Sequence, residues 1–165
     1  MVLVRDCSSV QPSEKKLRFT REPIAFNDDD LEGTIQPHDD ALVVVARING
    51  FIVKRVLINQ GSGAEVMYPN LFKVHGLKNE DLSKYNMPLV KFDGRMMILE
   101  GQISLLVNME GKELTVTFIV VALFSLYTAI LGRLWIHAMG AVLSTLHVKV
   151  KFRIEQSIAI VRGSQ

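Results

Sequence analysis

The stretch Val56-Leu57-Ile58-Asn59-Gln60-Gly61-Ser62-Gly63-Ala64 decides how the chain is interpreted. A β-branched apolar run that ends in small residues is typical of a buried strand that stops abruptly and passes its last polar side chain, Asn59, to a tight turn. Gly61 permits a positive φ or the close approach of another chain, and the Ser62 hydroxyl can bond a polar neighbour. Taken alone, the segment also fits an ordinary turn at a strand end.

Length and composition predict one soluble globular domain. The chain has 165 residues, of which 48% are hydrophobic, enough for a substantial core. The formal net charge of +2 is too small to predict nucleic-acid binding. Cys7 is the only cysteine, and residues 1–10 lack the apolar stretch of a signal peptide. No internal disulfide is therefore expected, and an intracellular, cytoplasmic location is favoured.

The longest apolar stretch, residues 118–131, is interrupted by Ser125 and Thr128. It is shorter than the roughly 20 residues that a membrane-spanning helix needs, so no membrane association is expected. The stretch is interpreted as two buried strands joined by an apolar turn that leaves Leu123 and Phe124 near the surface.

Residues 1–37 are expected to form a flexible polar linker, and residues 38–165 the folded domain. The linker is basic at first and turns acidic at Asp28-Asp29-Asp30 and Glu32, with little hydrophobic periodicity. The acidic run lacks the alternating ligands and the distant glutamate of an EF-hand loop. A solvated loop is therefore favoured over a metal site, and no metal or cofactor is expected.

From residue 41 the pattern changes to short strands separated by turns. Asn49-Gly50 predicts a type I′ hairpin between strands at 42–48 and 51–58, because both turn positions need a positive φ. Asp93-Gly94 predicts a second tight hairpin, and residues 110–112 a third, between strands at 103–109 and 113–121.

Two short helices are expected. Pro69 begins the first and Gly76 ends it, with His75 as a helix-end residue that favours the helix dipole rather than a metal. The second stops at Gly140 and carries on one face Leu134, Trp135, Ala138 and Met139. The pattern as a whole is that of a small all-β domain with one or two short helices.

The last predicted strand, residues 147–153, alternates cationic and apolar side chains. Its apolar side chains are assigned to the core. The cations Lys149, Lys151 and Arg153 are interpreted as a solvated face, with contact to an acidic partner as the alternative.

The order of these elements resembles the retropepsin-like aspartic protease domain, most closely that of plant gypsy-type retrotransposon gag-pol polyproteins. A strand ends in the polar-Gly-Ser turn, a glycine-tipped hairpin follows, and Ala129-Ile130-Leu131-Gly132-Arg133 runs into a helix. From about residue 24 onward further segments resemble the plant group, among them Asp28-Asp29-Asp30-Leu31-Glu32-Gly33, Val53-Lys54-Arg55-Val56-Leu57, Trp135-Ile136-His137 and Ser144-Thr145-Leu146-His147. The resemblance implies a closed barrel or sandwich of short strands, with one lobe per chain.

The resemblance also implies a homodimer that acts on an extended peptide or polyprotein, with one catalytic residue from each protomer meeting at a two-fold axis. Asn59, Gly61 and Ser62 match the catalytic turn. Implied peptide-binding positions lie in the hairpin that forms the flap and in the segment supporting the turn: Phe92, Asp93, Gly94, Arg95, Ile130, Leu131 and Gly132. In an active pair two carboxylates share one proton, and the ionised carboxylate activates the attacking water.

Asn59 departs from the family pattern, which has aspartate at this position. A carboxamide neither takes up a proton at neutral pH nor shares one with its twin, so a dimer with two asparagines has no general base. Gln60 also replaces the small hydroxyl residue that bonds across the dimer in retropepsins. The sequence thus predicts an aspartic endopeptidase domain, ancestrally a polyprotein processor, that is catalytically silenced.

Two alternatives stay open. The first is a non-enzymatic dimerisation or peptide-binding module, in which the cleft holds an extended strand without cutting it. The second is an active enzyme, either because this chain pairs with a protomer that keeps its aspartate or because Asn59 was introduced to trap a substrate.

Overall fold

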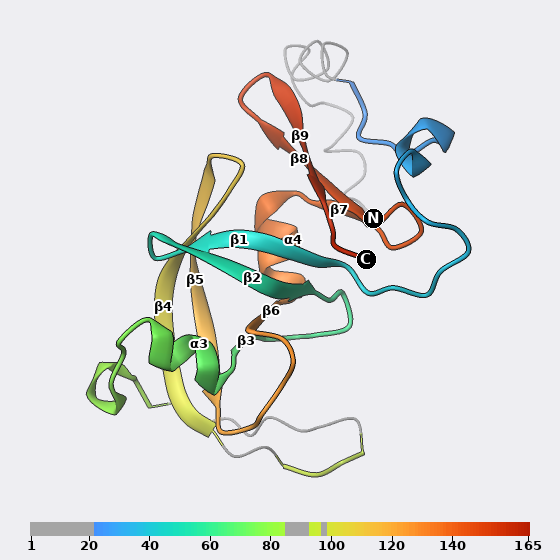
Figure 1. The fold of residues 1–165 in the computed structure, drawn as a ribbon. Helices are drawn as coiled ribbons and strands as arrows, with labels where there is room; N and C mark the ends of the chain where they lie inside the picture. The colour runs from blue at the N-terminus through green and yellow to red at the C-terminus, as the bar shows by residue number, and fades with distance from the viewer. Residues whose placement is uncertain (1–21, 85–92, 97–98) are drawn as a thin grey trace, which may run out of the picture.

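The computed structural model describes residues 22–84, 93–96 and 99–165, which form a closed barrel and a separate three-stranded sheet (Figure 1). The barrel order is β1-β2-β6-β3-β5-β4, with β1 (Val43–Ile48), β2 (Phe51–Ile58), β3 (Glu65–Met67), β4 (Leu99–Met109), β5 (Lys112–Val121) and β6 (Ala129–Leu131). The sheet contains β7 (Val142–Ser144), β8 (Lys149–Ile154) and β9 (Ser157–Arg162). The helices are the 3-10 helices η1 (Asp28–Leu31) and η2 (Asn79–Asp81) and the α-helices α3 (Pro69–Val74) and α4 (Arg133–Met139). The expected mostly-β class with two short α-helices is confirmed.

Two tight turns close the long antiparallel pairs of the barrel. The Asn49-Gly50 turn has φ values of 51° and 86° and joins β1 to β2, as predicted. The Glu110-Gly111 turn has φ values of 51° and 85° and joins β4 to β5. Lys112 already pairs with Met109 in the ladder, so this hairpin has a two-residue turn rather than the expected three.

Parallel pairing brings the ends of β2 and β6 together. Ile58 lies opposite Leu131 in this pair, while β3 pairs with both β6 and β5. Because parallel strands end at the same edge of a sheet, the residues that follow them, Asn59 and Gly132, emerge side by side.

Helix α4 packs on the barrel and ends at Gly140, whose φ of 63° is the left-handed conformation expected for a helix stop. Its inward face differs from the prediction, because Leu134 is 66% exposed and Ala138 is also exposed. The row that faces the barrel lies one position further along the helix and consists of Trp135, Ile136 and Met139.

Helix α3 begins at Pro69 and is followed by Gly76 with a φ of 67°, as predicted. The two ring nitrogens of His75 lie 3.2 Å from the carbonyl oxygen of Leu71 and 2.9 Å from that of Ile48. His75 therefore joins the end of the helix to the first hairpin.

Residues 22–36, which we call the N-terminal strap, lie along the C-terminal sheet, as the blue and red segments of Figure 1 show. Lys151 is only 8% exposed; its ammonium lies 2.9 Å from the Asp30 carboxylate and donates to the carbonyl oxygen of Ala25 at 2.8 Å. Lys149 and Arg153 also donate to carbonyl oxygens of the strap. The prediction that these three cations form a solvated face is therefore wrong. The prediction that the acidic run is a solvated loop is also wrong for Asp30, which pairs with Lys151.

The strap is also held by ring contacts. Phe26 stacks on His147 with ring centroids 5.1 Å apart, and the Lys151 ammonium lies 4.6 Å from the Phe26 centroid. The domain boundary after residue 37 stays a prediction. In the described part of the chain, no helix is both long and apolar enough to cross a membrane.

Candidate functional site

The turn after β2 folds around Asn59. The Asn59 main-chain amide donates to the carbonyl oxygen of Leu131 at 3.0 Å, which ties the end of β2 to the end of β6. The side-chain Oδ1 accepts the amide of Gly61 at 2.9 Å, and the main-chain oxygen accepts the amide of Ser62 at 3.2 Å. Because Oδ1 faces the Gly61 amide, the NH₂ group of the carboxamide faces away from it.

The same turn packs directly on the junction between β6 and α4. The Ser62 hydroxyl donates to the carbonyl oxygen of Ala64 at 2.6 Å, and the main-chain oxygen of Ser62 accepts the amide of Arg133 at 2.9 Å. A Cβ atom at Gly132 would lie 2.6 Å from the Ser62 oxygen and 2.8 Å from the Ala64 oxygen. Only glycine therefore allows the two segments to approach this closely.

A buried carboxylate supports this junction. Glu65 is 4% exposed, and its Oε2 accepts the main-chain amides of Gly132 at 3.0 Å and Trp135 at 3.3 Å. These amides belong to the first turn of α4, where a carboxylate satisfies free N–H groups. Glu65 is not among the site residues predicted from the sequence, although a carboxylate within the apolar run from Ala64 to Met67 was a usable signal.

Arg133 reaches back over the turn from the first position of α4. Its Nη1 donates to the main-chain oxygen of Gln60 at 3.3 Å. A Cβ atom at Gly63 would lie 2.9 Å from Nη2 of the same guanidinium. Gln60 and Gly61 are exposed at the tip of the turn.

The described residues of the expected flap form a tight turn. Gly94 has a φ of 85°, and Arg95 donates to the Asp93 carboxylate from its main-chain amide at 3.0 Å and from Nε at 2.7 Å. Asp93, Gly94 and Arg95 are all exposed. Phe92 lies outside the described residues. Contact between this turn and a peptide stays a prediction.

Ile130 and Leu131 of β6 and the following Gly132 contribute to the site in different ways. Leu131 is fully buried, so it supports Asn59 through its main chain. Ile130 is half-buried, and Gly132 is packed under the turn. Their contact with a peptide is likewise a prediction.

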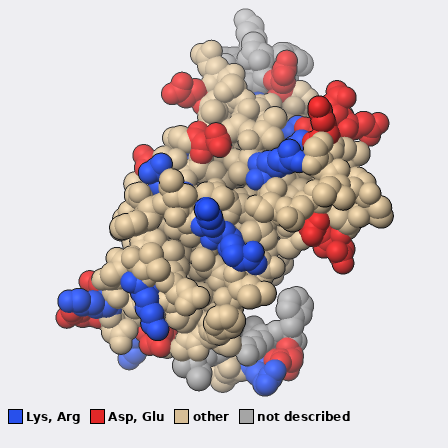
Figure 2. All heavy atoms as spheres, viewed as in Figure 1, with Lys and Arg blue, Asp and Glu red and all other residues tan. Residues whose placement is uncertain are grey.

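Charge is dispersed over one face of the molecule (Figure 2). On the face shown in Figure 2, basic and acidic side chains are intermixed, with no concentrated basic region. Within residues 22–84, 93–96 and 99–165, no group of three or more His, Cys, Asp or Glu side chains is arranged to hold a metal ion.

Solved structures share this architecture. The retroviral protease-like domain of Ddi1 from Leishmania major has a TM-score of 0.57 and 17% identity over 77% of this chain and 96% of that chain. The EIAV protease, solved with the inhibitor HBY-793, has a TM-score of 0.53 and 16% identity over 67% of this chain and 99% of that chain. No protein-family model and no curated protein matches the sequence. The chain thus has the retropepsin-like aspartic protease fold.

Proposed function

We propose that the chain is a retropepsin-type aspartic endopeptidase domain, derived from a plant gypsy-type retrotransposon polyprotein and catalytically silenced at Asn59. The observation that carries the proposal is the hydrogen bond from the Gly61 amide to Asn59 Oδ1, at 2.9 Å. It supports the assignment of this carboxamide to the place of the family's carboxylate, at the end of β2 in a retropepsin-like fold.

The side-chain amide of Asn59 accounts for the proposed loss of catalysis. In an active dimer one carboxylate takes the proton of the attacking water while the other, protonated, donates to the developing oxyanion. The NH₂ group of Asn59 can donate a hydrogen bond but cannot accept that proton. Loss of a general base costs about 10² to 10⁴ in rate, and the same residue also supplies the acid, so we expect no useful turnover.

A homodimer is part of the proposal, since one chain carries only one copy of the turn. The exposed Gln60 and Gly61 and the half-buried Ile130 would lie at the two-fold interface and the cleft. An extended peptide or polyprotein segment is the expected occupant.

A second candidate function is a peptide-binding module that does not cleave. The orientation of the Asn59 carboxamide favours it, because the NH₂ group faces away from the Gly61 amide and has the chemistry to donate to a peptide carbonyl. Such binding needs no ionisable group at the centre.

The test is Asn59→Asp, a nearly isosteric change. Two carboxyls would face each other across the dimer, one pKa would rise, and cleavage of apolar-junction peptides should appear at mildly acidic pH. Asn108→Asp is the matched control, because Asn108 Oδ1 also accepts a turn amide, that of Gly111 at 3.2 Å, at the far end of β4. The wild type and the control should both be inert.

Three outcomes separate the candidates. Cleavage by the wild type at a rate comparable to Asn59→Asp would overturn the silencing. A folded, dimeric Asn59→Asp that neither cleaves nor binds a statin-type peptide would contradict the endopeptidase assignment. Selective peptide binding by the uncleaving wild type would favour the binding module over a silenced remnant.

A further inference from the structure

A pocket of about 250 Å³ lies between α4 and β5. Leu134 and Ala138 of α4 and Thr115 and Thr117 of β5 form part of its wall. The wall is made of described residues, and none of them belongs to the turn at residues 59–64. The pocket therefore lies in a part of the molecule that the proposed function does not use.

Trp135 brings to this wall an indole Nε1 that has no hydrogen-bond partner in the described part of the chain. The residue is 2% exposed, and Nε1 itself is buried. An unpaired buried donor destabilises the folded state, so such groups are rare in proteins and call for an explanation. A bound group that brings an acceptor to Nε1 would remove this penalty.

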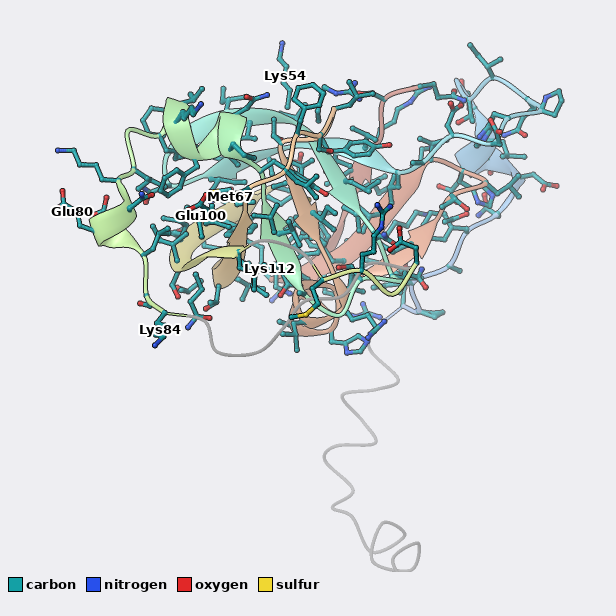
Figure 3. All side chains as sticks on the ribbon, turned by 90° about the horizontal axis from the view of Figure 1, so that it is seen from below. Lys54, Met67, Glu80, Lys84, Glu100 and Lys112 are labelled. Carbon is teal, nitrogen blue, oxygen red and sulfur yellow. The ribbon has the colours of Figure 1, made fainter. Side chains whose placement is uncertain are left out.

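Glu65 supplies the complementary chemistry at the same wall, a hydrogen-bond acceptor. It lies on the same face of β3 as the fully buried Met67, which Figure 3 labels within the body of the molecule. Within residues 22–84, 93–96 and 99–165, both hydrogen bonds to its carboxylate end on Oε2, from the amides of Gly132 and Trp135. Oε1 therefore keeps its capacity to accept a hydrogen bond.

The size and lining of the pocket favour an organic occupant over a single bound water. One water takes up roughly 30 Å³ of liquid volume, and a buried water needs two to four polar partners. The pocket has several times that volume, and the side chains of Leu114, Leu134 and Ala138 offer no hydrogen bond. A ligand with an apolar body and one polar head matches this wall better.

We propose that the pocket between α4 and β5 binds a small uncharged ligand through a carboxamide head, which donates to Glu65 Oε1 and accepts from Trp135 Nε1. The apolar body of the ligand packs on Leu134 and Ala138. An ammonium head has no acceptor for the indole, and a carboxylate head would be repelled by Glu65. The site goes beyond the proposed function, since it needs neither a dimer nor a general base.

The indole N–H resonance of Trp135 tests the site directly, because Trp135 is the only tryptophan in the chain. Benzamide is the probe, and it should shift this resonance saturably with a Kd of about 1 mM or tighter at pH 7. Benzylamine and benzoate have the same ring with a charged head, and each should bind about tenfold more weakly or worse. An unmoved indole resonance at saturating benzamide for such a Kd would overturn the site. Equal binding of either charged probe would overturn the carboxamide assignment.

A blocking variant tests the location. Leu134→Arg places a long charged side chain in the wall at a position that is 66% exposed, so the chain should fold and benzamide should bind about tenfold more weakly. Leu146→Arg is the matched control, because Leu146 is 55% exposed and lies outside the pocket wall. Its benzamide affinity should equal that of the wild type. Unchanged binding in Leu134→Arg, or an equal loss in Leu146→Arg, would overturn the location.

Glu65→Gln tests the acceptor. Its carbonyl oxygen can still accept the amides of Gly132 and Trp135, while its NH₂ group replaces the free oxygen that the ligand needs. Benzamide should bind about fivefold more weakly to a variant whose thermal unfolding shows that it is folded. Unchanged affinity would overturn the role of Oε1, and if the variant did not fold, Leu134→Arg would still decide the location.

Discussion

The Lys151 ammonium lies 2.9 Å from the Asp30 carboxylate, and the two side chains are only 10% and 12% exposed. The pair joins the N-terminal strap to β8 at a place nearly closed to water, where Lys151 also donates to the carbonyl oxygen of Ala25. Removing one partner of a buried ion pair leaves an uncompensated buried charge. This destabilises the folded state more than removing one partner of an exposed pair does. The strap is therefore expected to contribute to the stability of the folded domain.

Asp30→Asn should lower the free energy of unfolding by about 1–3 kcal/mol, because the amide keeps a hydrogen-bond acceptor but leaves Lys151 without its counter-charge. Asp28→Asn is the matched control, since Asp28 lies in the same short helix and is exposed. Its effect should stay within about 0.5 kcal/mol. Urea unfolding measures both, and equal effects would contradict a special role for the pair.

The same pair predicts how stability depends on pH. The hydrogen bond from Lys151, with a further one from the Asn27 main chain, holds the pKa of Asp30 below its ordinary value of 3.8. Because the folded-state pKa is the lower one, the contribution of the carboxylate is complete above the unfolded value and is lost as the pH falls through the folded value. The stability difference between wild type and Asp30→Asn should therefore shrink below pH 3.8. A difference that stays constant or grows on acidification would refute this origin.

Gly132→Ala should be one of the most damaging small substitutions in the chain. Its Cβ would lie within 2.8 Å of two main-chain oxygens that the surrounding hydrogen bonds hold in place. We expect a loss of about 3 kcal/mol or more in unfolding free energy, at the upper end of overpacking effects. Gly61→Ala is the comparison, because its Cβ would meet a single side-chain atom, Asn59 Oδ1, at 3.2 Å. Similar losses of stability for the two variants in thermal unfolding would show that Gly132 does not lie as close to the Ser62 and Ala64 oxygens as described.

Sedimentation should find a dimer at tens of micromolar protein, as expected for an association of about −8 kcal/mol. Gln60→Arg would place two like charges at the proposed two-fold contact and should shift the chain to monomer. Gln156→Arg, in the exposed turn between β8 and β9, adds the same charge elsewhere and should leave the dimer intact. If the wild type were only a monomer, the result would count against the proposed dimer. If Gln156→Arg were also a monomer, the effect of Gln60→Arg would not show that Gln60 lies at the dimer contact.

Features that depend on a few neighbouring residues could be predicted from the sequence. The Asn49-Gly50 hairpin and the helix stop at Gly140 follow from positive φ values that these residue types tolerate. The strand that ends at Ile58 and the turn from Asn59 through Gly61 and Ser62 were likewise predictable, because an apolar run followed by small polar residues restricts the chain locally.

Contacts between side chains from distant parts of the chain could not be predicted in this way, and they are known from the folded structure alone. The strap covers Lys151, Glu65 accepts the amides at the start of α4, and the inward row of α4 lies one position away from the predicted one. Periodicity describes each segment alone, whereas burial of a charge or the rotation of a seven-residue helix depends on the surface that packs against it. The hydrogen bond from Arg55 Nε to the carbonyl oxygen of Leu126 is of the same kind, since Arg55 has a φ of 62° and a left-handed arginine is tolerated only with the contacts that the folded barrel supplies.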